Sequence, residues 1–144
     1  MKKLIILFLS ICFFSGCGDE DSYSKVVENF IVENNTDTSF VVVWDKEMFP
    51  EIPQFDTVRG SQERNYYADK NNYKLWLTEL QLNELFSKML IFKIKGTDSL
   101  VVNKKYYSEI NSWSNQKYTD DWFGSVTFYN SHRLKITDDM FIVK

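Results

Sequence analysis

The sequence changes its hydrophobic period within residues 78–95, which are TELQLNELFSKMLIFKIK. The first part has apolar residues three or four positions apart, the stripe of a helix packed on a core. The stripe consists of Leu82, Leu85, Phe86, Met89 and Leu90. Thr78 followed three positions later by Gln81 is a capping-box signature. The stretch therefore predicts a helix from about residue 79 to residue 88.

Strand patterns follow this helix. Residues 90–95 alternate apolar side chains with lysines, and residues 96–102 contain a turn and a returning apolar run. Residues 126–129 and 134–136 also alternate. Asn130-Ser131-His132 lies between them and favours a turn, so we expect a C-terminal hairpin with His132 in the turn.

A second hairpin is expected near the start of the domain. Residues 28–32 and 39–45 are rich in β-forming residues, and the turn-favouring segment NNTDT separates them at 34–38. The strand at 39–45 is apolar on both faces, which is typical of a central strand.

The remaining segments are less regular. Residues 45–73 contain Pro50 and Pro53 and are expected to be mainly loop, with a short strand at 56–58. A strand is expected at 74–78 and a helical turn at 137–139. A second short helix, capped by Asn103, is expected to contain Tyr106, Ile110 and Trp113. Together the patterns predict a mainly β or α+β fold, an antiparallel β-sandwich-like sheet with two short helices.

The N-terminus has the pattern of an export signal. Lys2 and Lys3 precede an apolar run of about 11 residues, which is shorter than the roughly 20 residues of a membrane-spanning helix. Phe14-Ser15-Gly16-Cys17 follows and resembles a bacterial lipobox, although leucine is usual at the position of Phe14. This resemblance implies cleavage before Cys17 and lipidation of its thiol. An ordinary signal peptide with a free Cys17 thiol is the alternative.

These boundaries divide the chain into a removed signal peptide at 1–16, an acidic lipid-anchored tether at 17–24 and one globular domain at 25–144. The chain resembles small bacterial envelope lipoproteins in its lipobox, its Asn-Asn-Thr turn, its proline-containing loop and its closing segment LKITDDMF. Gly18, rather than aspartate, follows Cys17, and its resemblance to lipoprotein sorting signals implies the outer membrane. The acidic residues 19–21 resemble the export tag of surface lipoproteins or are a solvated spacer, so the cell surface and the periplasmic face both stay open. The resemblance to envelope lipoproteins implies no specific activity.

Composition narrows the function classes. The net charge of −3 provides no basic field for nucleic acid. An acidic domain also does not bind anionic lipids by itself, so the membrane contact is expected to be the lipid alone. His132 is the only histidine, and no Gly-x-Ser-x-Gly motif supplies a serine nucleophile. One histidine and no free cysteine do not suit zinc, so we expect no metal and no cofactor.

Aromatic and acidic residues gather in one short segment. They are Trp113, Tyr118, Asp120, Asp121 and Trp122. Aromatic rings can stack on the C–H groups of sugars while carboxylates accept hydroxyl hydrogens, and the same rings suit a protein partner. Alternatively, the aromatic residues fold inward as part of the core.

The sequence therefore favours a non-enzymatic binding module for an envelope protein or a glycan. A small hydrolase that uses carboxylates, and an immunity-like inhibitor of a toxin, are the alternatives. The oligomeric state is not predicted.

Overall fold

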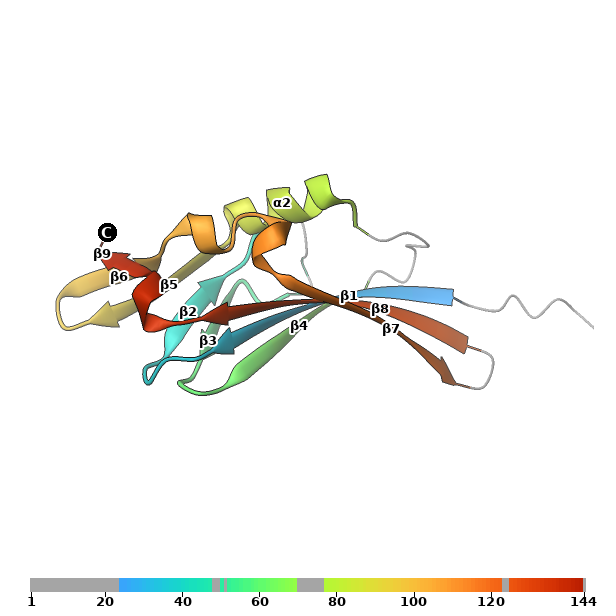
Figure 1. The fold of residues 1–144 in the computed structure, drawn as a ribbon, viewed down its shortest axis with the longest axis horizontal. Helices are drawn as coiled ribbons and strands as arrows, with labels where there is room; N and C mark the ends of the chain where they lie inside the picture. The colour runs from blue at the N-terminus through green and yellow to red at the C-terminus, as the bar shows by residue number, and fades with distance from the viewer. Residues whose placement is uncertain (1–23, 48–49, 51, 70–76, 123–124, 144) are drawn as a thin grey trace, which may run out of the picture.

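The computed structural model describes residues 24–47, 50, 52–69, 77–122 and 125–143. In these residues two β-sheets pack into a mainly β, α+β sandwich, with one α-helix and short 3-10 turns (Figure 1). Sheet A contains, in spatial order, β4 (Glu63–Asp69), β1 (Ser24–Asn34), β8 (Ser125–Ile136) and β7 (Ser114–Trp122). Sheet B contains, in spatial order, β3 (Phe55–Val58), β2 (Phe40–Val43), β5 (Leu90–Lys95), β6 (Asp98–Val102) and β9 (Phe141–Val143).

The pairing of β1 with β8 joins the two ends of the domain. It is parallel, with Ser24 opposite Val126 and Asn34 opposite Ile136, whereas every other described strand pair is antiparallel. The antiparallel expectation therefore holds except at the centre of sheet A. Because parallel partners need a long connection, nearly the whole domain lies between these two strands.

The helix α2 (Glu79–Lys88) confirms the predicted helix and its start. Thr78 Oγ1 accepts from Gln81 N, and Gln81 Oε1 accepts from Thr78 N at 2.9 Å, so the capping box is formed. Its buried residues join a core to which both sheets contribute, and Figure 1 shows the strands of sheet A extending beyond the helix. Among the described residues, no helix combines the length and the apolarity needed to cross a membrane.

The predicted hairpin over residues 28–45 is wrong. The strands β1 and β2 belong to different sheets, and the segment between them is a corner that passes from one sheet to the other. The Asn34 side chain holds this corner, because Nδ2 donates to the carbonyl oxygens of Thr38 at 2.8 Å and Val58 at 2.9 Å. Its Oδ1 accepts from the Thr36 backbone N–H at 2.9 Å. Turn residues reverse the chain locally but do not select the strand that pairs next. The central position predicted for β2 is confirmed, since it lies between β3 and β5.

The predicted C-terminal hairpin is also wrong. The strand β8 continues from Ser125 to Ile136, and Asn130, Ser131 and His132 lie buried in its middle. Both backbone edges of this segment are occupied by ladder bonds to β1 and β7. Burial between two strands therefore overrides the local turn preference of these residues.

Two further expectations change. Residues 63–69 form β4 rather than a loop, because the buried Tyr66 and Ala68 alternate with exposed residues. Residues 70–76 lie outside the described residues, as does most of the strand predicted at 74–78. The predicted second helix is instead two 3-10 turns, η1 (Lys104–Tyr106) and η2 (Ile110–Ser112). Asn103 does cap the first turn, and the final predicted turn is η3 (Asp138–Met140). The strands predicted at 56–58, 90–95 and 100–102 are confirmed as parts of β3, β5 and β6. In β5 the predicted alternation of apolar residues and lysines does not give the buried face, because Ile91 and Lys93 are buried and Ile94 is exposed.

Candidate functional site

The outer face of sheet A is the surface of the sheet that points away from the core. Side chains alternate along strands, and Phe30, Val32 and Leu134 belong to the core cluster, so the intervening residues of β1 and β8 point outward. The strand register places four residues side by side across the outer face. They are Tyr67 of β4, Asn29 of β1, Ser131 of β8 and Gln116 of β7.

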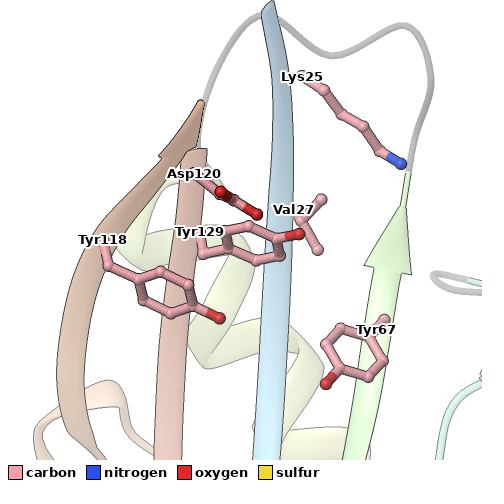
Figure 2. A pocket seen from close by; sticks show the side chains of 6 residues that line it. All are labelled: Lys25, Val27, Tyr67, Tyr118, Asp120 and Tyr129. Carbon is pink, nitrogen blue, oxygen red and sulfur yellow. The ribbon is translucent and has the colours of Figure 1, made fainter. Parts of the chain in front are cut away.

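A tyrosine-lined hollow occupies one end of the outer face (Figure 2). Tyr118 and Tyr129 stack with ring centroids 4.6 Å apart and planes 8° from parallel. Tyr67 lies across β1 from this pair, with Val27 between them. Lys25 and Asp120 complete the lining of a space of about 370 Å³. The hollow thus combines three aromatic rings with one residue of each charge; we call it the tyrosine hollow.

A second hollow of about 560 Å³ adjoins the first, since Tyr67 and Tyr118 line both. Its lining includes Asn29 and Ser131, which are only 4% and 7% exposed. Asn29 Nδ2 donates to Ser131 Oγ at 3.3 Å, and Asn29 Oδ1 has no hydrogen-bond partner in the structure. This second space, the amide hollow, therefore contains a buried polar atom whose bonding capacity is unused.

Charged side chains at the far end of the amide hollow pair with one another. Arg133 Nη1 lies 2.6 Å from Glu63 Oε2 and 3.3 Å from Glu33 Oε2. The hydrogen bond with Glu63 is the largest cause of the raised pKa of the Arg133 guanidinium, and Glu33 adds to it. Because this cation is shared between two carboxylates, this end of the hollow presents little net positive charge to a ligand.

Directly behind the amide hollow, on the core side of sheet A, lies a buried polar network. His132, only 1% exposed, places Nε2 2.8 Å from Glu28 Oε2, and its ring stacks on Phe30 with centroids 5.5 Å apart. Asn130 Nδ2 donates to the same Glu28 oxygen at 2.9 Å. The other Glu28 oxygen accepts from the Leu77 backbone N–H at 3.0 Å. The interpretation of His132 as a polar turn residue is wrong, because the side chain is buried on the core side of sheet A, with its ring 6.3 Å from that of Phe86 in α2.

The Glu28 carboxylate can only accept hydrogen bonds, and this fixes how the amides and the imidazole of the network are oriented. It requires Asn130 to present Nδ2 to Glu28 and therefore Oδ1 to Asn115, whose Nδ2 lies 2.7 Å away. The same Asn115 Nδ2 lies 3.1 Å from His132 Nδ1, which must accept. The imidazole hydrogen therefore resides on Nε2 and is donated to Glu28.

The inner network and the outer hollow are at the same level of the sheet. Glu28 precedes Asn29 in β1, and Asn130 and His132 flank Ser131 in β8. The network bonds β1 to β8 across their parallel pairing, so it holds Asn29 and Ser131 next to each other on the opposite face.

The structure separates the five aromatic and acidic residues that the sequence grouped. Tyr118 and Asp120 line the tyrosine hollow, whereas Trp113 is in the core, stacked on Phe86 at 4.2 Å and donating from Nε1 to the Tyr107 carbonyl at 2.8 Å. Asp121 is exposed on the other face of β7. The Trp122 backbone continues the register of Tyr118, but its side chain is outside the described residues, as is Cys17.

Sequence reasoning missed Tyr67, Tyr129, Asn29 and Ser131. A two-residue period in residues 63–69 and 125–136 was the available signal, and it was weak because both faces of these strands contain polar residues. Within the described ranges, no cluster of three or more histidine, cysteine or acidic side chains is arranged to hold a metal ion.

No protein-family model, curated protein or solved structure matches the chain.

Proposed function

We propose that this chain is a non-enzymatic binding module that holds a glycan on the outer face of sheet A. The observation that supports this most directly is the stacked pair Tyr118–Tyr129 opposite Tyr67. The C–H faces of a sugar ring pack against aromatic rings, while hydroxyl groups bond to nearby amides and acids. Pockets that combine apolar or aromatic walls with a few placed polar groups are typical binding sites for small ligands.

The exposure of the rings favours binding over a structural role. Tyr67 and Tyr118 are about half exposed, whereas Trp113 and Tyr107 are in the core. Leaving aromatic surface in contact with water is unfavourable, so exposed rings grouped around a hollow are characteristic of contact sites.

The second part of the proposal is the location. We propose that the chain is anchored in the bacterial outer membrane by lipid on Cys17, as its lipobox resemblance implies. The first strand begins at Ser24, and seven residues of chain can extend at most about 25 Å. Because Lys25 and Val27 line the tyrosine hollow, the ligand would be bound close to the anchoring membrane.

The binding proposal is tested with the purified full-length protein and a panel of soluble oligosaccharides, by titration calorimetry. We expect Tyr118→Ala and Tyr67→Ala each to weaken binding by about tenfold or more, with little change in the melting temperature. Phe55→Ala is the control, because Phe55 is an exposed aromatic residue on sheet B. Wild-type protein that binds no member of the panel, or tyrosine variants that bind normally, would contradict the proposal.

Two other observations would assign the alternatives. Cleavage of an oligosaccharide of the panel by the wild-type chain would identify a hydrolase. In a separate affinity capture from envelope extracts, an envelope protein retained by the wild type and by Phe55→Ala, but not by Tyr118→Ala, would identify a protein partner, of which a toxin would be one kind.

The anchor is tested separately by metabolic labelling with a palmitate analogue. The wild-type chain should take up the label and fractionate with the outer membrane, and Cys17→Ser should do neither. Labelling of both chains, or of neither, would contradict lipidation at Cys17.

A further inference from the structure

Asn29 is an unusual residue for its position. Its neighbours on the same face of β1 are Val27 and Ile31, both buried, and a β-branched residue would be favoured at the centre of such a strand. Instead the position has an amide that is 4% exposed and leaves Oδ1 without a hydrogen-bond partner. A buried polar atom without a partner destabilises the folded protein. A residue that costs stability and lines a hollow is a candidate for ligand contact.

The bonding capacity of this site does not depend on how the amide is oriented. With Nδ2 toward Ser131, as in the structure, Asn29 Oδ1 is free to accept and the Ser131 hydroxyl can turn to donate. With the amide reversed, Asn29 Nδ2 would be free to donate and Ser131 Oγ would keep a lone pair to accept. Either orientation offers one donor and one acceptor side by side.

This pairing of one donor with one acceptor matches an uncharged hydroxyl group, which donates and accepts through a single atom. A carboxylate or phosphate would require donors only, and an ammonium group would require acceptors only. Arg133, the cation nearest along the hollow, is already paired with Glu63 and Glu33.

We infer that Asn29 and Ser131 form a polar subsite that binds a hydroxyl group of an uncharged glycan, an inference that rests on the proposed function. Asn29 Oδ1 is covered in the structure, so a neighbouring side chain has to turn aside when the ligand enters. Tyr67 pairs directly opposite Asn29 and is half exposed, and we assign this movement to its ring.

The test compares the full-length wild type with the double variant Asn29→Val and Ser131→Ala, which removes both partners and leaves no new unpaired group. The probes are the uncharged tetrasaccharides cellotetraose, maltotetraose and chitotetraose, with tetragalacturonate as the charged probe. We expect the double variant to melt at a higher temperature and to bind the uncharged probe at least about tenfold more weakly. Thr57→Val, a polar-to-apolar change on the exposed face of β3, is the control and should alter neither quantity much.

A second measurement uses the wild type alone and therefore does not depend on the folding of a variant. In NMR titrations with the bound uncharged probe, the side-chain amide signals of Asn29 should shift. Unshifted signals, an unchanged affinity of the double variant, a lower melting temperature of that variant, or binding of tetragalacturonate alone would each overturn the subsite. In those cases a loss of binding in Tyr118→Ala would still support the proposed function. Wild-type protein that binds neither the four probes nor any glycan of the wider panel would overturn both the subsite and the proposed function.

Discussion

Glu28 and His132 are 104 positions apart in the chain, yet Glu28 Oε2 and His132 Nε2 lie 2.8 Å apart in the buried centre of sheet A. The contact joins the only parallel strand pair of the described residues. It also places the outward-facing Asn29 beside Ser131, because each of these follows or precedes a member of the buried pair. The stability of the core and the geometry of the outer face therefore depend on the same strand register.

Replacing Glu28 with glutamine should destabilise the domain strongly. The carboxylate accepts bonds from Leu77, Asn130 and His132, so the NH₂ group of the new amide would have to face at least one donor. We expect Glu28→Gln to lower the free energy of unfolding by about 3 kcal/mol in urea titrations. The control is Glu33→Gln in the same strand, whose partly exposed ion pair with Arg133 should be worth less than about 1 kcal/mol. Equal effects of the two variants would show that the inner network contributes no special stability.

The second prediction concerns which ring nitrogen of His132 carries the hydrogen. The hydrogen-bond network puts the ring hydrogen on Nε2 and makes Nδ1 an acceptor from Asn115. Long-range proton–nitrogen NMR spectra should therefore show a protonated Nε2 and an unprotonated Nδ1 at neutral pH. In Asn115→Ala the Nδ1 acceptor loses this partner, and its nitrogen signal should move. A wild-type spectrum with the hydrogen on Nδ1 would contradict the assigned amide orientations.

The corner between the sheets makes Gly60 sensitive to substitution. A Cβ atom at Gly60 would lie 2.8 Å from the backbone carbonyl carbon and oxygen of Asp37, which is too close for van der Waals contact. We expect Gly60→Ala to cost about 1 to 3 kcal/mol of unfolding free energy because the two backbones must separate.

Gly96 is the matched control for this variant. It has a φ of +65° but no atom within 4 Å of an added Cβ, so its alanine variant should lose about 1 kcal/mol through backbone conformation alone. Asparagine tolerates this conformation, so Gly96→Asn should recover most of the loss, while Gly60→Asn should not recover that of Gly60→Ala. Chemical denaturation of the four variants tests this difference, and recovery at both sites would exclude a steric cause at Gly60.

Alkaline pH should destabilise the domain through Tyr107. Burial raises the pKa of its hydroxyl from 10.0 to about 12, and the hydroxyl donates to the Met89 carbonyl at 3.1 Å. The folded state holds this proton more tightly than the unfolded chain. The resulting stabilisation is complete below pH 10 and is lost as the pH rises from 10 to about 12, by roughly 2 to 3 kcal/mol.

Tyr107→Phe separates this contribution from that of other groups. The variant should lose about 1 kcal/mol at pH 8 with the hydrogen bond, and its unfolding free energy should then fall less steeply above pH 10. Burial, with a smaller contribution from Asp56, also raises the pKa of Tyr66, so some alkaline destabilisation should remain. Urea midpoints measured from pH 8 to 11.5 would contradict the assignment if both chains gave the same slope.

The elements that sequence reasoning predicted correctly are those with local signals. The helix at 79–88 has its capping box within four residues and its apolar stripe within nine, and the strands at 90–95 and 98–102 are joined by a turn at Gly96. Tyr118 and Asp120 were found because aromatic and acidic residues are dense around them. Tyr67 and Tyr129 lie far apart in the sequence and come to the same hollow only through the pairing of three strands.

By itself, then, the sequence determined the β-rich class and, among the described residues, the helix with its start and the strands that follow it, since propensity and period act over a few neighbouring residues. Tertiary structure alone settled that Asn130, Ser131 and His132 continue a strand, that Asn34 turns the chain into a second sheet, and that Asn29 reaches Ser131. The reason is that polar side chains with strong turn preferences become favourable within a buried sheet only when partners about a hundred residues away satisfy them.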